Sequence, residues 1–166
     1  MIELIFVIVI LGILASVAIP RLAATREDAE ISAAVANLRT LISDASAYYT
    51  VKETLTNAKW NEITNLPLKK GAGGFPIDST TQANAIVHLK VGDTNNCIGV
   101  KLVDRANTAP AHILIAKINP TGVCKQVQDA DPLKPYFNST VAGVTTDPNI
   151  VGAIIIGSST SVHTKP

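Results

Sequence analysis

The chain begins with a nearly continuous apolar stretch, Met1-Ile-Glu-Leu-Ile-Phe-Val-Ile-Val-Ile-Leu-Gly-Ile-Leu-Ala-Ser-Val-Ala-Ile19. Glu3 is the only ionisable side chain in it. About 20 apolar residues cross the hydrocarbon core of a bilayer as a helix, because the helix rises about 1.5 Å per residue. A single segment in lipid must also satisfy its backbone polar groups internally, which only a helix does. The stretch therefore predicts a membrane-spanning helix.

Glu3 helps to decide among three interpretations of the apolar stretch: a cleavable secretory signal, a simple membrane anchor, and a helix that pairs with a neighbouring chain. A cleavable secretory signal has a basic start and a small-residue cleavage site. Here the basic start is absent, and the apolar run continues into a helical pattern. A simple anchor leaves the acid unexplained, because a carboxylate in hydrocarbon is costly and usually marks a function with a partner. We expect the partner of Glu3 to be the positive N-terminal amine of a neighbouring identical chain.

The helical pattern continues beyond the apolar stretch. Pro20 removes one helical hydrogen bond and Gly12 is a second weak point, so a kink or local melting is expected there. Apolar residues then recur at steps of three and four along one face, at Ile31, Val35, Leu38, Ile42, Ala45 and Tyr49. One helix from Ile2 to Lys52 would be about 75 Å long. Its first half must lie in lipid or against other helices, and its second half presents one stripe to a globular head.

The first residues resemble a known family. Met1-Ile-Glu-Leu-Ile, Gly12 and Ala18-Ile-Pro20 followed by Arg21 are similar to the N-terminal segment of type IV pilins and type II secretion pseudopilins. The spacing of 17 residues from Glu3 to Pro20 is that of the family. The resemblance covers roughly the first 50 residues. Relative to the family, the sequence lacks the leader peptide and two mature residues, commonly Phe-Thr, which implies either a trimmed sequence or an altered processing site.

The resemblance implies the major structural subunit of a type IV pilus. Such a subunit is stored in the inner membrane and methylated at its N-terminus. The pilus assembly machinery polymerises it with copies of itself into a helical, extracellular filament on a bacterial surface, used for adhesion, motility or DNA uptake. Glu3, Gly12 and Pro20 would be the assembly residues. Two alternatives stay open, a pseudopilin of a type II secretion system and a membrane-tethered binding or catalytic domain.

The fold expected is α+β, with a long N-terminal helical spine and a small antiparallel β-sheet head. Residues 1–52 would form the helix, with residues 1–20 as the hydrophobic spine, and residues 53–166 the head. A short helix is predicted at Thr56–Asn65, with Trp60 and Ile63 pointing inward, and a polar, mobile tail at Gly157–Pro166. Loops or irregular stretches are predicted at Gly71–Pro76 and around Pro132 and Pro135. The predicted strands are Ala85–Val91, Ile98–Val103, Ala111–Ile118, Val123–Val127 and Ile150–Ile156.

Of the two cysteines, Cys97 stands at the start of the predicted strand Ile98–Val103, and Cys124 lies in the predicted strand Val123–Val127. Neither has a Cys or His partner two to four residues away, so their spacing matches no zinc pattern. If the head leaves the cytoplasm, as the apolar stretch indicates, its environment permits a disulfide. We therefore expect a Cys97–Cys124 disulfide.

Few other residues suggest chemistry. His88, His112 and His163 are far apart, and the Gly-x-Ser-x-Gly and phosphate-loop patterns are absent. Asp129 and Asp131 fall far short of the six to eight oxygen ligands that calcium takes. The formal net charge of +1 and the single Lys69-Lys70 pair predict no nucleic-acid surface. We expect no enzyme activity, no cofactor and no metal.

One modification site is readable. Asn138-Ser-Thr140 satisfies the Asn-x-Ser/Thr sequon, so Asn138 is a candidate for glycosylation in an exported protein.

Overall fold

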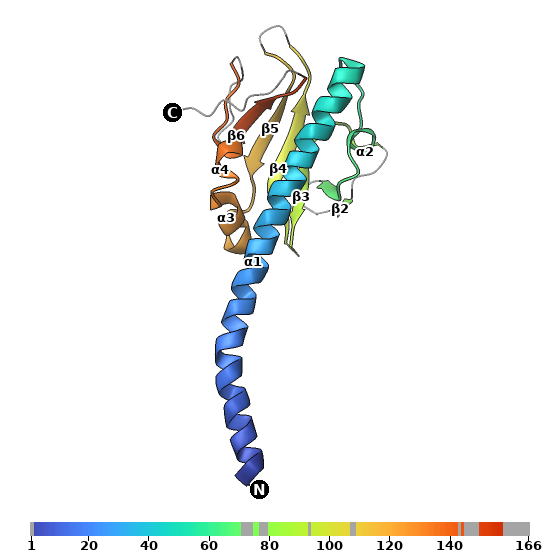
Figure 1. Cartoon of the computed structure of the whole chain (residues 1–166). Coiled ribbons are helices and arrows are strands. Elements are labelled where there is room, and N and C mark those ends of the chain that lie inside the picture. Colours follow the sequence, from blue (N-terminus) through green and yellow to red (C-terminus); the bar gives the residue numbers. More distant parts are fainter. Residues whose placement is uncertain are drawn as a thin grey trace.

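The structure is a computed structural model that describes residues 2–70, 75–76, 80–92, 94–106, 109–142, 144 and 150–157. One long helix carries a head of strands and short helices along its C-terminal half (Figure 1). The predicted α+β fold, a helical spine with an antiparallel sheet head, is confirmed.

Helix α1 runs from Ile2 to Lys52 without a break. Its backbone is helical through Pro20, so the local melting predicted there is wrong for the single chain. An interruption between Gly12 and Pro20 in an assembled filament stays a prediction. The predicted apolar face of the second half is confirmed, since Val35, Leu38 and Ala45 are buried and the other three members pack against the core.

The head contains one antiparallel sheet of six described strands in the order β2-β1-β3-β4-β5-β6. Strands β3 (Val87–Val91), β4 (Thr94–Val103), β5 (His112–Lys117) and β6 (Ile150–Ile155) correspond to four predicted strands. They are rich in β-branched side chains, which pack well on a pleated surface. Strands β1 (Leu68–Lys70) and β2 (Phe75–Pro76) were not predicted, and the intervening residues 71–74 lie outside the described part.

The predicted strand at Val123–Val127 is wrong, because these residues belong to helix α3, Gly122–Asp129. The buried members of this segment are Cys124, Val127 and Gln128. Steps of three and four place these three side chains on one side of a helix, whereas a strand would alternate them between its faces.

The remaining short helices refine two predictions. Helix α2 covers only Trp60–Ile63 of the predicted Thr56–Asn65, and both terminal side chains are buried as expected. Helix α4, Lys134–Phe137, lies within the stretch predicted to be irregular. The tail beyond Gly157, predicted to be mobile, lies outside the described residues.

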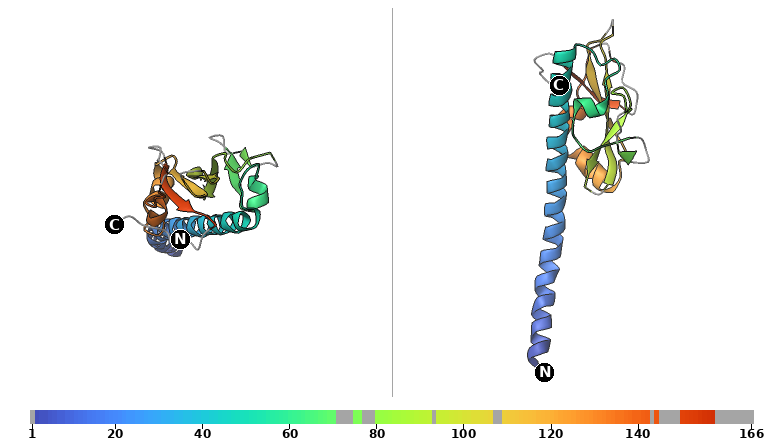
Figure 2. Two further views of the ribbon diagram at one scale, coloured as in Figure 1. Left: turned by 90° about the horizontal axis from the view of Figure 1, so that it is seen from above. Right: turned by 90° about the vertical axis from the view of Figure 1, so that its right-hand side faces the viewer.

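The core lies between α1 and one face of the sheet. Seen from above, the sheet curves over α1, with α2 beside one edge and α3 and α4 beside the other (Figure 2). Leu38 and Leu41 of α1 are fully buried, as are Trp60 and Ile113 of the head. The sheet thus holds the second half of α1 and leaves the first half projecting from the head.

Candidate functional site

The projecting half of α1 is the largest apolar surface that the structure describes. Its apolar side chains are 41–77% exposed from Ile2 to Leu22, and none of the residues in its most apolar 18-residue window is buried. By length and composition, α1 is the one described helix able to cross a membrane. Contiguous exposed apolar surface of this extent marks an interaction with lipid or with other proteins.

Glu3 lies in the first turn of α1, on the same projecting half as the exposed side chains of Ile2 and Leu4. The positive end of the helix dipole favours an anion in the first turn. The structure therefore places a carboxylate within the apolar surface, at the end of the molecule that is farthest from the head (Figure 1).

Gly12 makes no close contact within the chain. A Cβ atom built on it would meet nothing within 4 Å. Packing within the chain therefore gives no reason for a glycine at this position, and any packing reason must come from another molecule. Small residues allow neighbouring helices in a membrane to approach closely.

Helix α1 carries a second surface, which the alanines of the sequence indicate only in part. On the side of α1 that faces away from the head, small side chains recur at steps of three and four and are all exposed: Ala29, Ala33, Ala36, Thr40, Ser43 and Ala47. Steps of three and four form a seam along a helix. The signal was present in the alanines, but Ala34, which reads as part of the same set, is buried against the head. Only the packing of α1 against the head shows which small side chains are buried and which remain exposed.

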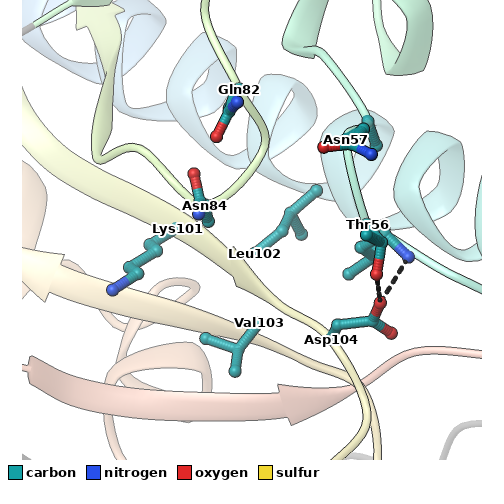
Figure 3. A pocket seen from close by; sticks show the side chains of 10 residues that line it. Thr56, Asn57, Gln82, Asn84, Lys101, Leu102, Val103 and Asp104 are labelled. Atoms are coloured by element: carbon teal, nitrogen blue, oxygen red, sulfur yellow. Dashed lines mark hydrogen bonds between the residues drawn. The ribbon is translucent and has the colours of Figure 1, made fainter.

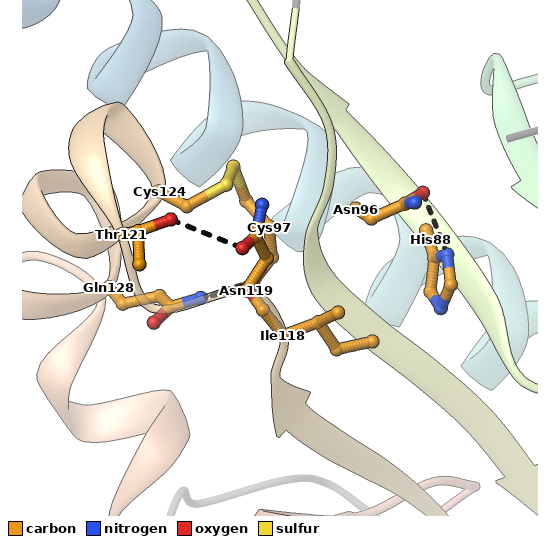
Figure 4. The surroundings of a disulfide bond; sticks show 8 residues. All are labelled: His88, Asn96, Cys97, Ile118, Asn119, Thr121, Cys124 and Gln128. Atoms are coloured by element: carbon orange, nitrogen blue, oxygen red, sulfur yellow. Dashed lines mark hydrogen bonds between the residues drawn. A yellow bond between two sulfur atoms is a disulfide. The ribbon is translucent and has the colours of Figure 1, made fainter. Parts of the chain in front are cut away.

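The predicted disulfide between Cys97 and Cys124 is confirmed, with a Cα–Cα distance of 4.9 Å. It joins β4 to α3, and both cysteines are fully buried (Figure 4). Beside it, the buried Gln128 donates from Nε2 to the carbonyl oxygens of Cys97 and Ile118, each at 2.6 Å. The covalent bond and the amide thus hold α3 against β4 and the end of β5, two interior strands of the sheet.

The two aspartates near α3 are paired with lysines. Asp129 lies 2.7 Å from Lys125 Nζ and 3.5 Å from Lys117 Nζ, and Asp131 lies 2.6 Å from Lys134 Nζ. The hydrogen bonds from Lys125 and Lys134 lower the pKa of these two carboxyl groups. Among the described residues, no three His, Cys, Asp or Glu side chains gather as a metal site would require.

The two described histidines, His88 and His112, lie in strands β3 and β5, within the strands predicted from the sequence, and the structure buries both. The Nδ1 atom of His88 lies 2.8 Å from Asn96 Oδ1 (Figure 4), and that of His112 lies 2.7 Å from the carbonyl oxygen of Pro110. His163 lies outside the described residues. These contacts give both buried rings a structural partner.

The sequon is accessible at its acceptor. Asn138 follows α4 and is exposed, whereas the next residue, Ser139, is 1% exposed and donates a hydrogen bond to the carbonyl oxygen of Tyr136. The structure therefore leaves the candidate glycosylation site open on the surface of the head.

A cleft of about 370 Å³ lies in the head, and no pattern in the sequence indicates it. At one end, Asp104 Oδ2 accepts a hydrogen bond from the Thr56 hydroxyl group (Figure 3), and it also accepts from the Thr54 hydroxyl group and the Leu55 backbone N–H. Desolvation raises the pKa of Asp104, but these hydrogen bonds and one from the backbone N–H of Arg105 lower it more. The carboxylate therefore fixes the segment that follows α1.

Comparisons with protein-family models, with curated proteins and with solved structures found no match for this chain. Its function is therefore inferred from the exposed half of α1, the acid within it and the disulfide-bonded head.

Proposed function

We propose that this chain is the major structural subunit of a filament of the type IV pilus kind. It polymerises with copies of itself through α1 into a helical, extracellular fibre on a bacterial surface, for adhesion, motility or DNA uptake. One observation carries the proposal: the first half of α1 exposes apolar side chains on all sides, while the second half holds a folded head.

The exposed apolar half needs two successive environments. Before assembly, the hydrocarbon of the inner membrane covers it, since a helix of this length matches the thickness of a bilayer. In the filament, the same half of neighbouring subunits replaces the lipid, and the assembly machinery moves each subunit from one environment to the other. Gly12 and the small-residue seam from Ala29 to Ala47 would let neighbouring helices approach closely.

Glu3 would set the register between subunits. A carboxylate that enters an apolar filament core needs a partner, and the N-terminal amine of the adjacent subunit supplies an opposite charge. Leaving one member of a buried ion pair unpaired typically costs about 3–5 kcal/mol. A subunit that inserts out of register would carry this cost, so the pair selects one position for each new subunit.

The head has the features of an exported domain. Its buried disulfide is typical of proteins in oxidising compartments and is rare in the cytoplasm. The alternative, a pseudopilin, shares the spine, and a calcium site in the head would favour it. The aspartates that could begin such a site, Asp129 and Asp131, are instead paired with lysines. This pairing favours the pilus.

The test is to image material sheared from the bacterial surface by electron microscopy, with wild-type chain and with Glu3→Gln. The substitution keeps size and removes charge, so we expect normal membrane insertion and few or no fibres. Asp28→Asn is the matched control, because Asp28 is an exposed acid on the same helix outside the apolar stretch. It should give wild-type fibres.

Each outcome has one meaning. Micrometre fibres from the wild type support the pilus, short stubs support the pseudopilin, and the absence of any polymer rejects a filament subunit. Wild-type fibre yield from Glu3→Gln would remove the pairing role of this carboxylate while leaving the filament itself in place.

A further inference from the structure

We propose that the cleft in the head, between the segment Leu55–Ala58 and the end of β4, binds an uncharged saccharide. Its lining comes from three segments: the residues that follow α1, the loop before β3, and the last residues of β4 with Asp104. The inference concerns the head alone and does not depend on polymerisation.

The walls of the cleft are fixed by hydrogen bonds. The backbone N–H of Ala83 donates to the carbonyl oxygen of Ala58 at 2.8 Å, and that of Leu102 donates to the carbonyl oxygen of Ala83 at 3.1 Å. Asp104 ties the residues after α1 to the end of β4 through three further hydrogen bonds. The cleft is therefore built before any ligand arrives, which lowers the entropy that binding must overcome.

The rim of the cleft carries unused hydrogen-bonding groups. Asn57, Gln82 and Asn84 present side-chain amides around the apolar Leu102 (Figure 3). All three amides are exposed, and they make no hydrogen bond within the described part of the chain. The amine of Lys101, at the same rim, likewise has no ion pair or hydrogen bond there.

Amides match the chemistry of sugar hydroxyl groups. Each amide offers two donors and one acceptor, and each hydroxyl group both donates and accepts, so one pair can form in either direction. Apolar surface for the C–H face of a sugar ring comes from the half-buried Val103, above the buried Leu102 and Leu55. The volume of the cleft also lies within the range of small-molecule sites, which starts at about 300 Å³.

Other ligand classes fit less well. A phosphate or nucleic acid calls for several cations, and Lys101 is the one cation among the lining residues, beside the anionic Asp104. A nucleobase calls for an aromatic ring to stack on, and the residues that line the cleft include none.

The position of the cleft keeps it accessible. Its lining includes Leu55–Ala58, which follow the C-terminal end of α1 at Lys52, whereas the apolar half of α1 projects from the other end of the head (Figures 1 and 2). Packing of the exposed helices against lipid or against each other would therefore leave this end of the head open.

The test is a titration of the ¹⁵N-labelled full chain in dodecylphosphocholine micelles, a detergent without sugar, followed by amide chemical shifts. The probes are the methyl glycosides of glucose, galactose and mannose, and N-acetylglucosamine, with inorganic phosphate as the charged comparison. We expect millimolar binding of at least one saccharide, with shifts confined to the residues that line the cleft.

Variants locate the binding. Asn84→Ala and Gln82→Ala should each weaken it about two- to tenfold, the value of one neutral hydrogen bond. Gln126→Ala, which removes an exposed amide from α3, should leave it unchanged. The proposal is overturned by the absence of cleft shifts with every saccharide, by binding of phosphate alone, or by equal weakening in Gln126→Ala. None of these results bears on fibre formation, so the two proposals fail separately.

Discussion

Breaking the disulfide between Cys97 and Cys124 should destabilise the head by an amount that its loop length sets. The two cysteines are 27 residues apart in sequence. In the chain-entropy model, cross-linking a loop of that length stabilises the folded state by about 3.5 kcal/mol at 25 °C, because it restricts the unfolded chain. The total stability of a small domain is about 5–15 kcal/mol, so this is a large share of it.

The assay uses the single tryptophan of the chain. Trp60 is fully buried in the head and donates from Nε1 to the carbonyl oxygen of Ala85 at 3.1 Å. Its fluorescence therefore reports unfolding of the head, and the large helical signal of α1 does not contribute. A denaturant titration of the full chain in micelles then gives the free energy of unfolding of the head.

Two proteins without the disulfide, reduced wild type and Cys97→Ala/Cys124→Ala, distinguish the effect of the covalent bond from the effect of packing by the sulfur atoms. Both cysteines are fully buried, so the wild type must be reduced while unfolded and then refolded. Reduced wild type keeps both sulfur atoms, whereas Cys97→Ala/Cys124→Ala also loses their packing and should be less stable still. If reduced and oxidised wild type differ by less than about 1 kcal/mol, the cross-link does not act through loop closure as the model requires.

Four further outcomes are expected. Gly152→Ala should cost about 1–3 kcal/mol of head stability or more by the same fluorescence assay, because its Cβ would strike the backbone of Tyr136 in α4, which cannot turn aside; wild-type stability would contradict that close approach. Gln128→Leu should cost about 1–3 kcal/mol, since it leaves the Ile118 carbonyl oxygen without its donor and removes one of two donors to the Cys97 carbonyl oxygen, which keeps the Ile118 N–H; a neutral result would mean that water replaces the amide. The fold lowers the pKa of Asp104 below its ordinary value near 3.8, so the ionised carboxylate stabilises the head above that pH, and this stabilisation is lost as the pH falls through the lower folded pKa. The difference in unfolding free energy between wild type and Asp104→Asn should therefore shrink over that acid range. A difference that stays constant with pH would refute the linkage. In the assembled filament, the helical hydrogen bonds between Gly12 and Pro20 should be interrupted, and a filament structure with an unbroken α1 would show otherwise.

Much of the spine could be predicted from the sequence, because its signals are local. The apolar stretch before Pro20 and the spacing of Val35, Leu38 and Ala45 each act through one element and its period. The disulfide could be expected from two cysteines and from the export that the apolar stretch predicts, although the element that carries Cys124 could not.

The head depended on contacts between elements. Val123–Val127 has the β-branched residues of a strand, but Cys124, Val127 and Gln128 are buried together, and only a helix places all three on one side. Nothing in the local sequence indicates that a glutamine belongs in the core. One of its acceptors, the carbonyl oxygen of Cys97, lies 31 residues away in β4, and the other, that of Ile118, directly follows β5.

The sequence by itself determined the long helix, its acid and the antiparallel character of the head, because periodicity and composition suffice for these. Only the tertiary structure decided which alanines of α1 face the head, as Ala34 does, and which remain exposed, as Ala33 does. It also decided that the amides of Asn57, Gln82 and Asn84 share one cleft. Both depend on how segments far apart in the chain pack together, and no local pattern encodes that packing.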